Sequence, residues 1–260
     1  MGDSRFDPTV GTLWLSPHAV AALVQADADP KSLSAAQRSE LSEGGFFADG
    51  GLHPLIASVA RTLGRPLIRL KLEHLGTAAP SCDGWFDERL AVLLARESAV
   101  RSESSASVLP RSLVPAYLAR TVNLGPRTRP KVADPIELDA ALVEALLASG
   151  EAFTPRQIEA LMPSVDDALP AWLDVLAVLS GGINGRWRVG VWWNSPTEQP
   201  RARLLEVVDS EVGLFLLVPR PRRSGGLRRL QLRPVTPTHI WRLLCTLVPP
   251  VDEVSEPLSP

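Results

Sequence analysis

An internal repeat is the feature of this sequence that most limits the folds it can adopt. The segments LSAAQRSEL at 33–41 and FTPRQIEAL at 153–161 align without a gap. Ser34 and Thr154 stand where a helix N-cap is expected, and each is followed three residues later by a glutamine, as in a capping box. Similarity at a fixed offset predicts two copies of one folding unit.

Each copy continues with the same order of elements. Apolar helical stripes at 55–63 and 172–179 precede glycine-containing breaks, after which PLIRLKLEHL at 66–75 and RWRVGVWW at 186–193 alternate as β-strands do. Further strand-like segments follow, and the last helix of the second copy is expected to be capped by Thr236 with a proline in its first turn. Each half therefore reads helix, helix, three strands, helix. The strands should be antiparallel, because short connections leave no room for a crossover.

The repeat predicts an α+β chain of two pseudo-repeated halves. A single three-stranded sheet leaves a face to cover, so we expect the two halves to join edges or pack faces. In the first half the later strand-like segments are WFDERLAVLLA at 85–95 and SAVRSESSASVL at 98–109. An amphipathic helix is expected over IELDAALVEALLA at 136–148.

The predicted division of the chain follows from this order. We expect an N-terminal half at 1–125, a linker rich in proline and arginine at 126–135, a C-terminal half at 136–250 and an acidic, flexible tail at 251–260. A chain of 260 residues is long enough to bury a core without disulfides or metals.

Composition and the N-terminus indicate a cytoplasmic protein. Hydrophobic residues make up 45% of the chain and its formal net charge is -2, as in soluble globular proteins. Two distant cysteines, Cys82 and Cys245, cannot build a disulfide framework. No cationic stretch followed by an apolar run opens the sequence, and its apolar runs are only as long as strands, so we expect no membrane insertion.

Motifs typical of enzymes are missing from the sequence. It contains no phosphate-binding GxxxxGK[ST] loop, no GxGxxG, no HExxH, no GxSxG and no pair of CxxC motifs. Its four histidines, His18, His53, His74 and His239, have no second ligand at metal-binding spacing. We therefore expect no enzymatic activity, no cofactor and no metal. The catalytic alternative is a Cys82 thiolate assisted by His74 or His53, and the simpler interpretation is a structural cysteine.

Two other functions remain open at this point. The segment RPRRSGGLRR at 220–229 places five arginines around a Gly-Gly pair, which favours a nucleic-acid-binding regulator. The negative net charge and the absence of aromatic residues from this segment favour an exposed connection instead. The second alternative is a small-molecule-binding protein that uses a cleft between the two halves.

The tryptophans of the strand at 186–193 indicate a partner surface. Trp187 and Trp193 share one face of that strand and Trp192 lies on the other. At least one indole should therefore lie opposite the core face, where tryptophan is a favoured anchor for protein partners. We expect replacement of Trp192 or Trp193 by alanine to weaken partner binding without unfolding the chain.

Several segments resemble the EspG family of actinobacterial type VII (ESX) secretion-associated proteins. The segments are LWLSPHAVAALVQ at 13–25, AQRSELSEGGFFADGGLHPLIASVARTL at 36–63 leading into PLIRLKLEHL, SLVPAYLARTVNLGPRTRPKVADPIELDAAL at 112–142, and LRRLQLRPVTPTHIWRLLCTLVPP at 227–250. Their pattern consists of apolar spacing and Gly-Pro punctuation, without a catalytic residue.

The resemblance implies both a fold and a function. It implies a quasi-twofold body with a central, mostly antiparallel sheet and helical bundles. It also implies a cytosolic chaperone that binds the apolar tip of a helical PE–PPE pair. In the family the partner is contacted by the loop between the second and third strands of the first half, which corresponds here to Arg96 and Glu97. The C-terminal half of the sheet also contributes, which corresponds here to Trp192 and Trp193.

Overall fold

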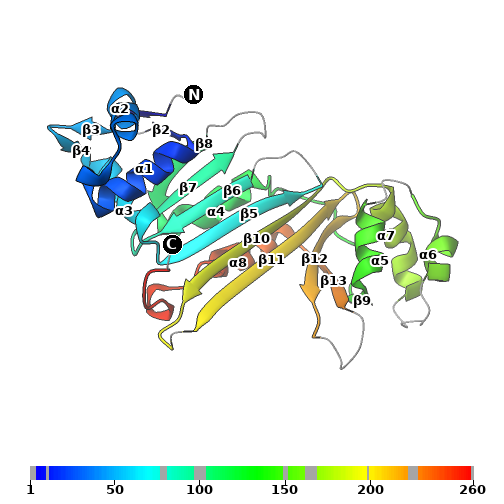
Figure 1. Cartoon of the computed structure of the whole chain (residues 1–260). Helices are drawn as coiled ribbons and strands as arrows, with labels where there is room; N and C mark the ends of the chain where they lie inside the picture. Colours follow the sequence, from blue (N-terminus) through cyan, green and yellow to red (C-terminus); the bar gives the residue numbers. More distant parts are fainter. Residues whose placement is uncertain are drawn as a thin grey trace.

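The computed structural model describes residues 4–9, 12–76, 81–96, 104–148, 152–161, 169–197, 199–221 and 228–258. These residues form an elongated molecule built on one long antiparallel sheet (Figure 1). Groups of helices lie at the two ends of the sheet, and two further helices lie behind its middle (Figure 1). The observed architecture is therefore of the predicted α+β class.

Within the described residues, eleven strands form the main sheet, and every neighbouring pair in it is antiparallel. In spatial order they are β1 (Arg5–Asp7), β2 (Thr12–Leu15), β8 (Ser104–Pro110), β7 (Leu90–Arg96), β6 (Ser81–Phe86), β5 (Ile68–Leu75), β10 (Gly185–Asn194), β11 (Pro200–Ser210), β12 (Gly213–Pro219), β13 (Arg229–Val235) and β9 (Ile136–Asp139). A separate hairpin consists of β3 (Phe47–Ala48) and β4 (Gly51–Leu52).

The helices fall into two groups of three and two single helices. They are α1 (Pro17–Ala28), α2 (Ala35–Glu43), α3 (Pro54–Gly64), α4 (Val114–Thr121), α5 (Ala140–Ala148), α6 (Pro155–Leu161), α7 (Leu169–Gly181) and α8 (Pro237–Leu247). Short 3-10 turns occupy Pro30–Ser32, Arg111–Leu113 and Val251–Glu253. Among the described helices, none has the length and apolar character needed to cross a bilayer.

The predicted helix caps are confirmed. The Ser34 hydroxyl accepts a hydrogen bond from the Gln37 backbone N–H at 3.2 Å, and the Gln37 side chain accepts one from the Ser34 N–H at 2.9 Å. Thr154 and Gln157 exchange the same two bonds at 3.3 and 2.8 Å. Thr236 caps α8 through its hydroxyl, with Pro237 in the first turn. These local bonds start the helices at the positions that the sequence predicts.

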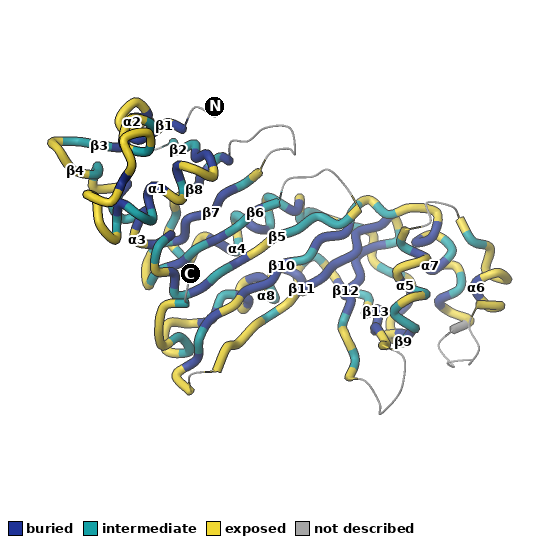
Figure 2. The backbone as a smooth tube through the Cα atoms, viewed as in Figure 1, coloured by how far each residue is buried: buried dark blue, intermediate teal, exposed yellow. Residues whose placement is uncertain are grey.

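The two faces of the sheet are covered differently. Helices α4 and α8 pack on the middle of one face, where their apolar residues join those of β5, β10 and β11 in the largest core. On the other face, α1 and α3 pack over β7 and β8, and α5 and α7 pack over β12, β13 and β9. Figure 2 shows dense burial along the strands, whereas α2 and the hairpin end between β10 and β11 are exposed. The middle of the second face, over β5 and β10, therefore has no described helix on it (Figure 1).

The prediction of three strands in each half is wrong, because each half contributes four consecutive strands. These are β5 to β8 before α4, and β10 to β13 before α8. In the first half the segment 85–95 is split by a turn at Asp87, whose carboxylate accepts hydrogen bonds from the backbone N–H groups of Arg89 and Leu90, both at 2.7 Å. An aspartate that bonds to the backbone two residues on is a turn former, and here it separates β6 from β7.

The helix predicted over 136–148 begins later than expected. Residues 136–139 are strand β9, in which Ile136 pairs with Leu232 and Asp139 with Arg229 of β13. Helix α5 starts only at Ala140, and the Asp139 carboxylate accepts a hydrogen bond from the Ala141 N–H at 2.8 Å. These residues pair with β13 as an additional strand, because β13 would otherwise present unpaired backbone groups at the edge of the sheet.

The segment predicted to be a linker is bound to the C-terminal half. Arg127 holds both carboxylate oxygens of Asp209 at 2.9 and 3.0 Å through its Nε. Nearby, Gly213 lies so close to Pro130 that a Cβ there would be 2.6 Å from the proline ring. The backbone carbonyl of Asp134 accepts a hydrogen bond from the buried Trp172 indole.

The C-terminal tail, which was expected to be flexible, is docked on the body over its described part. The Ser255 N–H donates to the Asn194 carbonyl at 3.0 Å, and the Leu258 N–H donates to the Pro66 carbonyl at 2.8 Å. Glu253 forms an ion pair with Arg203 at 2.6 Å. The tail thus connects the end of β10 with the start of β5.

Candidate partner-binding surface

The uncovered middle of the second sheet face is the main candidate site. The strand register places on it the side chains of β5, β6, β10 and β11 that point away from α4 and α8. We call these residues the open central face: Arg69, Lys71, Glu73, Asp83, Trp85, Arg188, Gly190, Trp192, Ala202 and Leu204. This surface lies between the two groups of three helices.

An apolar platform occupies one part of the open central face. Trp192 is 42% exposed and Leu204 is 54% exposed. A Cβ on Gly190 would lie 2.6 Å from Cη2 of Trp192, so the indole lies along its own strand against the Gly190 backbone. Leu204 is opposite Gly190 and Ala202 is opposite Trp192 on β11. Together Trp192, Ala202 and Leu204 present exposed apolar atoms on this face, and we call these three residues the indole platform.

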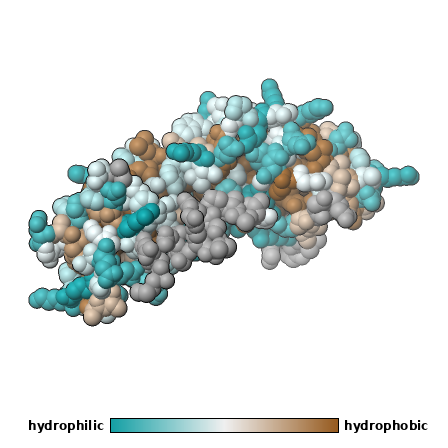
Figure 3. Space-filling view, turned by 90° about the horizontal axis from the view of Figure 1, so that it is seen from above, coloured by the Kyte–Doolittle hydropathy of each residue, from teal (hydrophilic) through white to brown (hydrophobic). Residues whose placement is uncertain are grey.

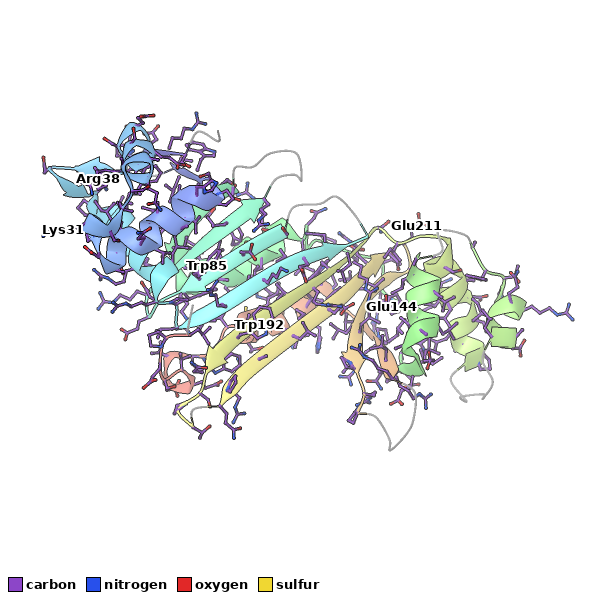
Figure 4. The ribbon with its side chains drawn as sticks, in the orientation of Figure 1. Lys31, Arg38, Trp85, Glu144, Trp192 and Glu211 are labelled. Atoms are coloured by element: carbon purple, nitrogen blue, oxygen red, sulfur yellow. The ribbon has the colours of Figure 1, made fainter. Side chains whose placement is uncertain are left out.

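Beside the indole platform, an arginine lies between two tryptophans. Arg69 of β5 is opposite Trp85 on one side and opposite Trp192 on the other. Its guanidinium carbon is 5.3 Å from the centroid of the Trp85 ring, within cation–π range. Partial burial lowers the pKa of Arg69 from its usual value, and the negative charge of Asp83 acts in the opposite direction. Figure 4 shows Trp85 and Trp192 on neighbouring parts of the central strands.

A network of ion pairs closes the side of the open central face next to the C-terminal helices. Arg186 is buried and binds Glu206 of β11 together with Glu144 of α5, whose two carboxylate oxygens lie 2.6 and 2.8 Å from its guanidinium nitrogens. Arg188 binds the other oxygen of Glu206 at 2.9 Å. Hydrogen bonds from Arg186 lower the pKa of the Glu144 carboxyl and raise that of the guanidinium. Helix α5 is thereby attached to the sheet, as the position of Glu144 in Figure 4 illustrates.

The four residues predicted to contact a partner have different surroundings. Trp192 lies on the open central face, as the alternation of the strand predicted. Trp193 is only 4% exposed, and its indole N–H donates to the Glu253 carbonyl at 3.1 Å. The prediction that Trp193 lies on a free surface is therefore wrong, because its side chain is in the core beneath the tail. Arg96 ends β7 and pairs with Asp83 at 3.3 Å, and Glu97 lies outside the described residues. The loop that begins there joins the third and fourth strands of the first half, not the second and third.

Arg69 and Leu204 were not among the residues predicted to contact a partner. The alternation of PLIRLKLEHL could have placed Arg69 opposite the core, because Ile68, Leu70 and Leu72 are all buried. No signal in the sequence indicates that β5 pairs with β10, and only this pairing brings Arg69 beside Trp192.

The arginine-rich segment at 220–229 is described only at its two ends. Arg220 forms an ion pair with Glu137 of β9 at 3.1 Å, and Arg229 donates to the Glu137 backbone carbonyl at 3.0 Å. Residues 222–227 lie outside the described part of the chain. The two arginines at the ends of the segment therefore hold the edge of the sheet together.

The cysteine considered as a nucleophile is in an apolar environment. Cys82 is fully buried against the α4 side of the sheet, and burial raises its pKa to about 12. His53 accepts a hydrogen bond from the Leu55 N–H at the start of α3. The Cys82 thiol is therefore protonated at neutral pH and is a poor nucleophile. Within the described residues, no group of three or more potential ligands is arranged to hold a metal ion.

A polar cleft of about 780 Å³ lies in the N-terminal half. It is lined by α1, α3 and the β6–β7 turn, with Asp27, Arg61, Arg65, Asp87 and Arg89 among its residues. Charges of both signs face it, and it does not lie between the two halves. It differs from the predicted small-molecule site, which was expected between the halves.

Comparisons with known proteins identify the fold. No protein-family model matches the chain, and no curated protein matches it in sequence. Among solved structures it is similar to the Mycobacterium tuberculosis type VII secretion system chaperone EspG5, solved in complex with the PE25–PPE41 dimer. The match has a TM-score of 0.60 at 12% sequence identity and covers 94% of this chain and 97% of EspG5. The resemblance seen in the sequence is thus confirmed at the level of the fold, and the chain has an EspG-like fold.

Proposed function

We propose that the chain is a cytosolic, non-enzymatic chaperone that binds a helical PE–PPE-type pair through the open central face. The observation that carries the proposal is the exposed indole platform on a sheet face that no described helix covers. Apolar surface of this kind, bordered by charged residues, is typical of a protein-binding site. The fold supports the proposal, since EspG5 has the same fold and was solved with a PE–PPE dimer.

The proposed contact extends from the open central face to its borders. Trp192 is the proposed central anchor, and Arg96 with Glu97 is proposed to contact the partner at the edge of the N-terminal half. The C-terminal helices add apolar surface at their end of the sheet, where Leu161 and Val178 are exposed. Figure 3 shows hydrophobic surface gathered over that end of the molecule.

The proposal includes the relation between the two halves. The elements β2, α1 to α3, β5 to β8 and α4 follow the same order as β9, α5 to α7, β10 to β13 and α8. We infer a quasi-twofold axis between β5 and β10, with halves at 1–125 and 136–250. The open central face includes residues of β5 and β10, so it lies on the seam where these halves would meet.

Binding of a PE–PPE pair encoded by the same genome tests the proposal directly. Trp192→Ala should weaken the affinity by about thirtyfold, because a central tryptophan anchor contributes about 2 kcal/mol or more. The matched control is Trp241→Ala, because Trp241 is 40% exposed but lies on α8 on the opposite face. Isothermal titration calorimetry of both variants and the wild type gives the comparison.

Two results would contradict the proposed function. One is the absence of binding of every such pair to the wild-type chain. The other is an equal loss of affinity in both tryptophan variants, which would place the binding surface away from the open central face.

A further inference from the structure

Among the described residues, Arg69 differs from the other cations of the open central face because those cations each have a carboxylate partner. Lys71 pairs with Glu73 at 2.6 Å, and Arg188 pairs with Glu206 at 2.9 Å. At the border of this face, Arg96 pairs with Asp83. Within the described residues, no carboxylate lies within the 4.0 Å ion-pair distance of Arg69.

The surroundings of Arg69 favour a strong interaction with an incoming anion. The Trp85 ring covers one side of the guanidinium, Trp192 is opposite Arg69 on the neighbouring strand, and partial burial already opposes the charge of the guanidinium. A partly desolvated guanidinium binds a carboxylate through two parallel hydrogen bonds, because its planar fork matches the two oxygens. Lysine lacks this fork, so arginine is the residue suited to the position.

We propose that Arg69 is a specificity-determining residue of the open central face, which binds an aspartate or glutamate side chain of the partner. An aliphatic side chain near that carboxylate would lie on the indole platform. This inference rests on the proposed function and adds the chemistry of the partner: an apolar helical tip that carries an acidic residue. Charge complementarity favours this occupant, since Arg69 is the cation of this face that has no carboxylate within ion-pair distance among the described residues.

The experiment measures the affinity of the full chain for the PE–PPE pair that binds the wild type. Arg69→Met keeps much of the length and apolar character of the side chain but removes its charge, and should weaken binding by at least about thirtyfold, as expected for loss of one member of a buried charge pair. Arg69→Lys should restore only part of the affinity. The matched control is Arg242→Met, which removes an exposed cation from α8 on the opposite face of the sheet and should change the affinity by less than about threefold.

Substitutions in the partner identify the carboxylate. Each acidic residue at the tip of the pair is changed to its amide in turn. One of these changes should weaken binding to the wild type by a similar factor and have no further effect on the Arg69→Met chain. The affinity of the wild type should also fall more steeply with salt than that of Arg69→Met.

The outcomes separate this inference from the proposed function. If the pair binds the wild type and Arg69→Met binds equally well, the inference is wrong and the proposed function stands. If Arg69→Met is weak but no acidic residue of the partner is coupled to it, Arg69 acts on the shape of the sheet and the inference is wrong. If no pair binds the wild type, the proposed function fails and the inference fails with it.

Discussion

Trp192 and Trp193 are neighbours in one strand, yet they lie in opposite environments. The period of a β-strand sends the Trp192 side chain to the open central face and the Trp193 side chain to the core under α4 and α8. Trp193 also lies near Arg203, whose guanidinium carbon is 5.1 Å from its ring. The two indoles should therefore respond in different ways to the same substitution.

At the residue scale, Trp193→Ala should lower the free energy of unfolding by about 3–5 kcal/mol, because it leaves a large cavity in a packed core. Trp192→Ala should change that free energy by less than about 1 kcal/mol, because its indole is on the surface. Urea unfolding followed by circular dichroism measures both. Equal stability of the two variants would contradict the assignment of Trp193 to the core.

At the scale of elements, strand β10 connects the parts of the molecule. It pairs with β5 along eight residues and with β11 along ten, and its Arg186 reaches α5 through Glu144. The sheet therefore acts as the scaffold, and the C-terminal helices are attached to it by an ion pair as well as by apolar packing.

The attachment of α5 should depend on pH. The pKa of Glu144 is lower in the folded chain than the value of about 4.3 for a free glutamate. Because the pKa of Glu144 is lower in the folded chain, its ion pair stabilises the fold fully when the pH is above the pKa of the unfolded chain. This stabilisation is lost as the pH falls through the pKa of the folded chain. Glu144→Gln should therefore destabilise the chain by about 1 kcal/mol at pH 7, since the carboxylate is half exposed. This difference from the wild type should shrink as the pH falls below about 4.3 and disappear once the pH is below the lowered pKa of the folded chain.

Thermal unfolding measures this difference when the wild type and Glu144→Gln are compared from about pH 3 to about pH 8. The matched control is Glu211→Gln, because Glu211 is exposed in the β11–β12 turn (Figure 4). The control should follow the wild type at every pH. A pH-independent effect of Glu144→Gln would show that its charge is not what attaches α5.

At the scale of the whole molecule, the C-terminal tail closes the seam between the halves. It contacts Pro66 before β5 and Asn194 at the end of β10, and Val254 packs against the central core. Its Glu253 carbonyl binds the Trp193 indole. A segment at the end of the chain thus holds together two strands that lie far apart in sequence.

Truncation after Pro250 should lower the free energy of unfolding by about 2–3 kcal/mol, because it removes several hydrogen bonds, each contributing about 1 kcal/mol. It should also shift tryptophan fluorescence to longer wavelength, since Trp193 loses its cover. Removal of residues 259–260 alone deletes none of these bonds and is the control. Unchanged stability and fluorescence in the longer truncation would contradict a structural role of the tail.

Local interactions are what the sequence by itself determined. The capping boxes at Ser34 and Thr154, the cap at Thr236 and the two faces of the Trp187–Trp193 strand were all predictable, because each depends on residues a few positions apart. The same local patterns predicted helices, then strands, then a last helix in each half, although each half has four consecutive strands instead of three. The place of Trp192 on a face opposite the core was predictable for this reason.

Only the tertiary structure decided which of these elements meet. Residues 136–139 form a strand because β13 offers them an unpaired edge, and the tail is ordered because the ends of β5 and β10 bind it. The burial of Trp193 under that tail and the place of Arg69 beside Trp192 likewise depend on pairing between distant segments. The arrangement of the whole sheet decides such pairings, because backbone hydrogen bonds between strands are the same for every sequence. The local sequence of a strand therefore does not specify which strand it pairs with.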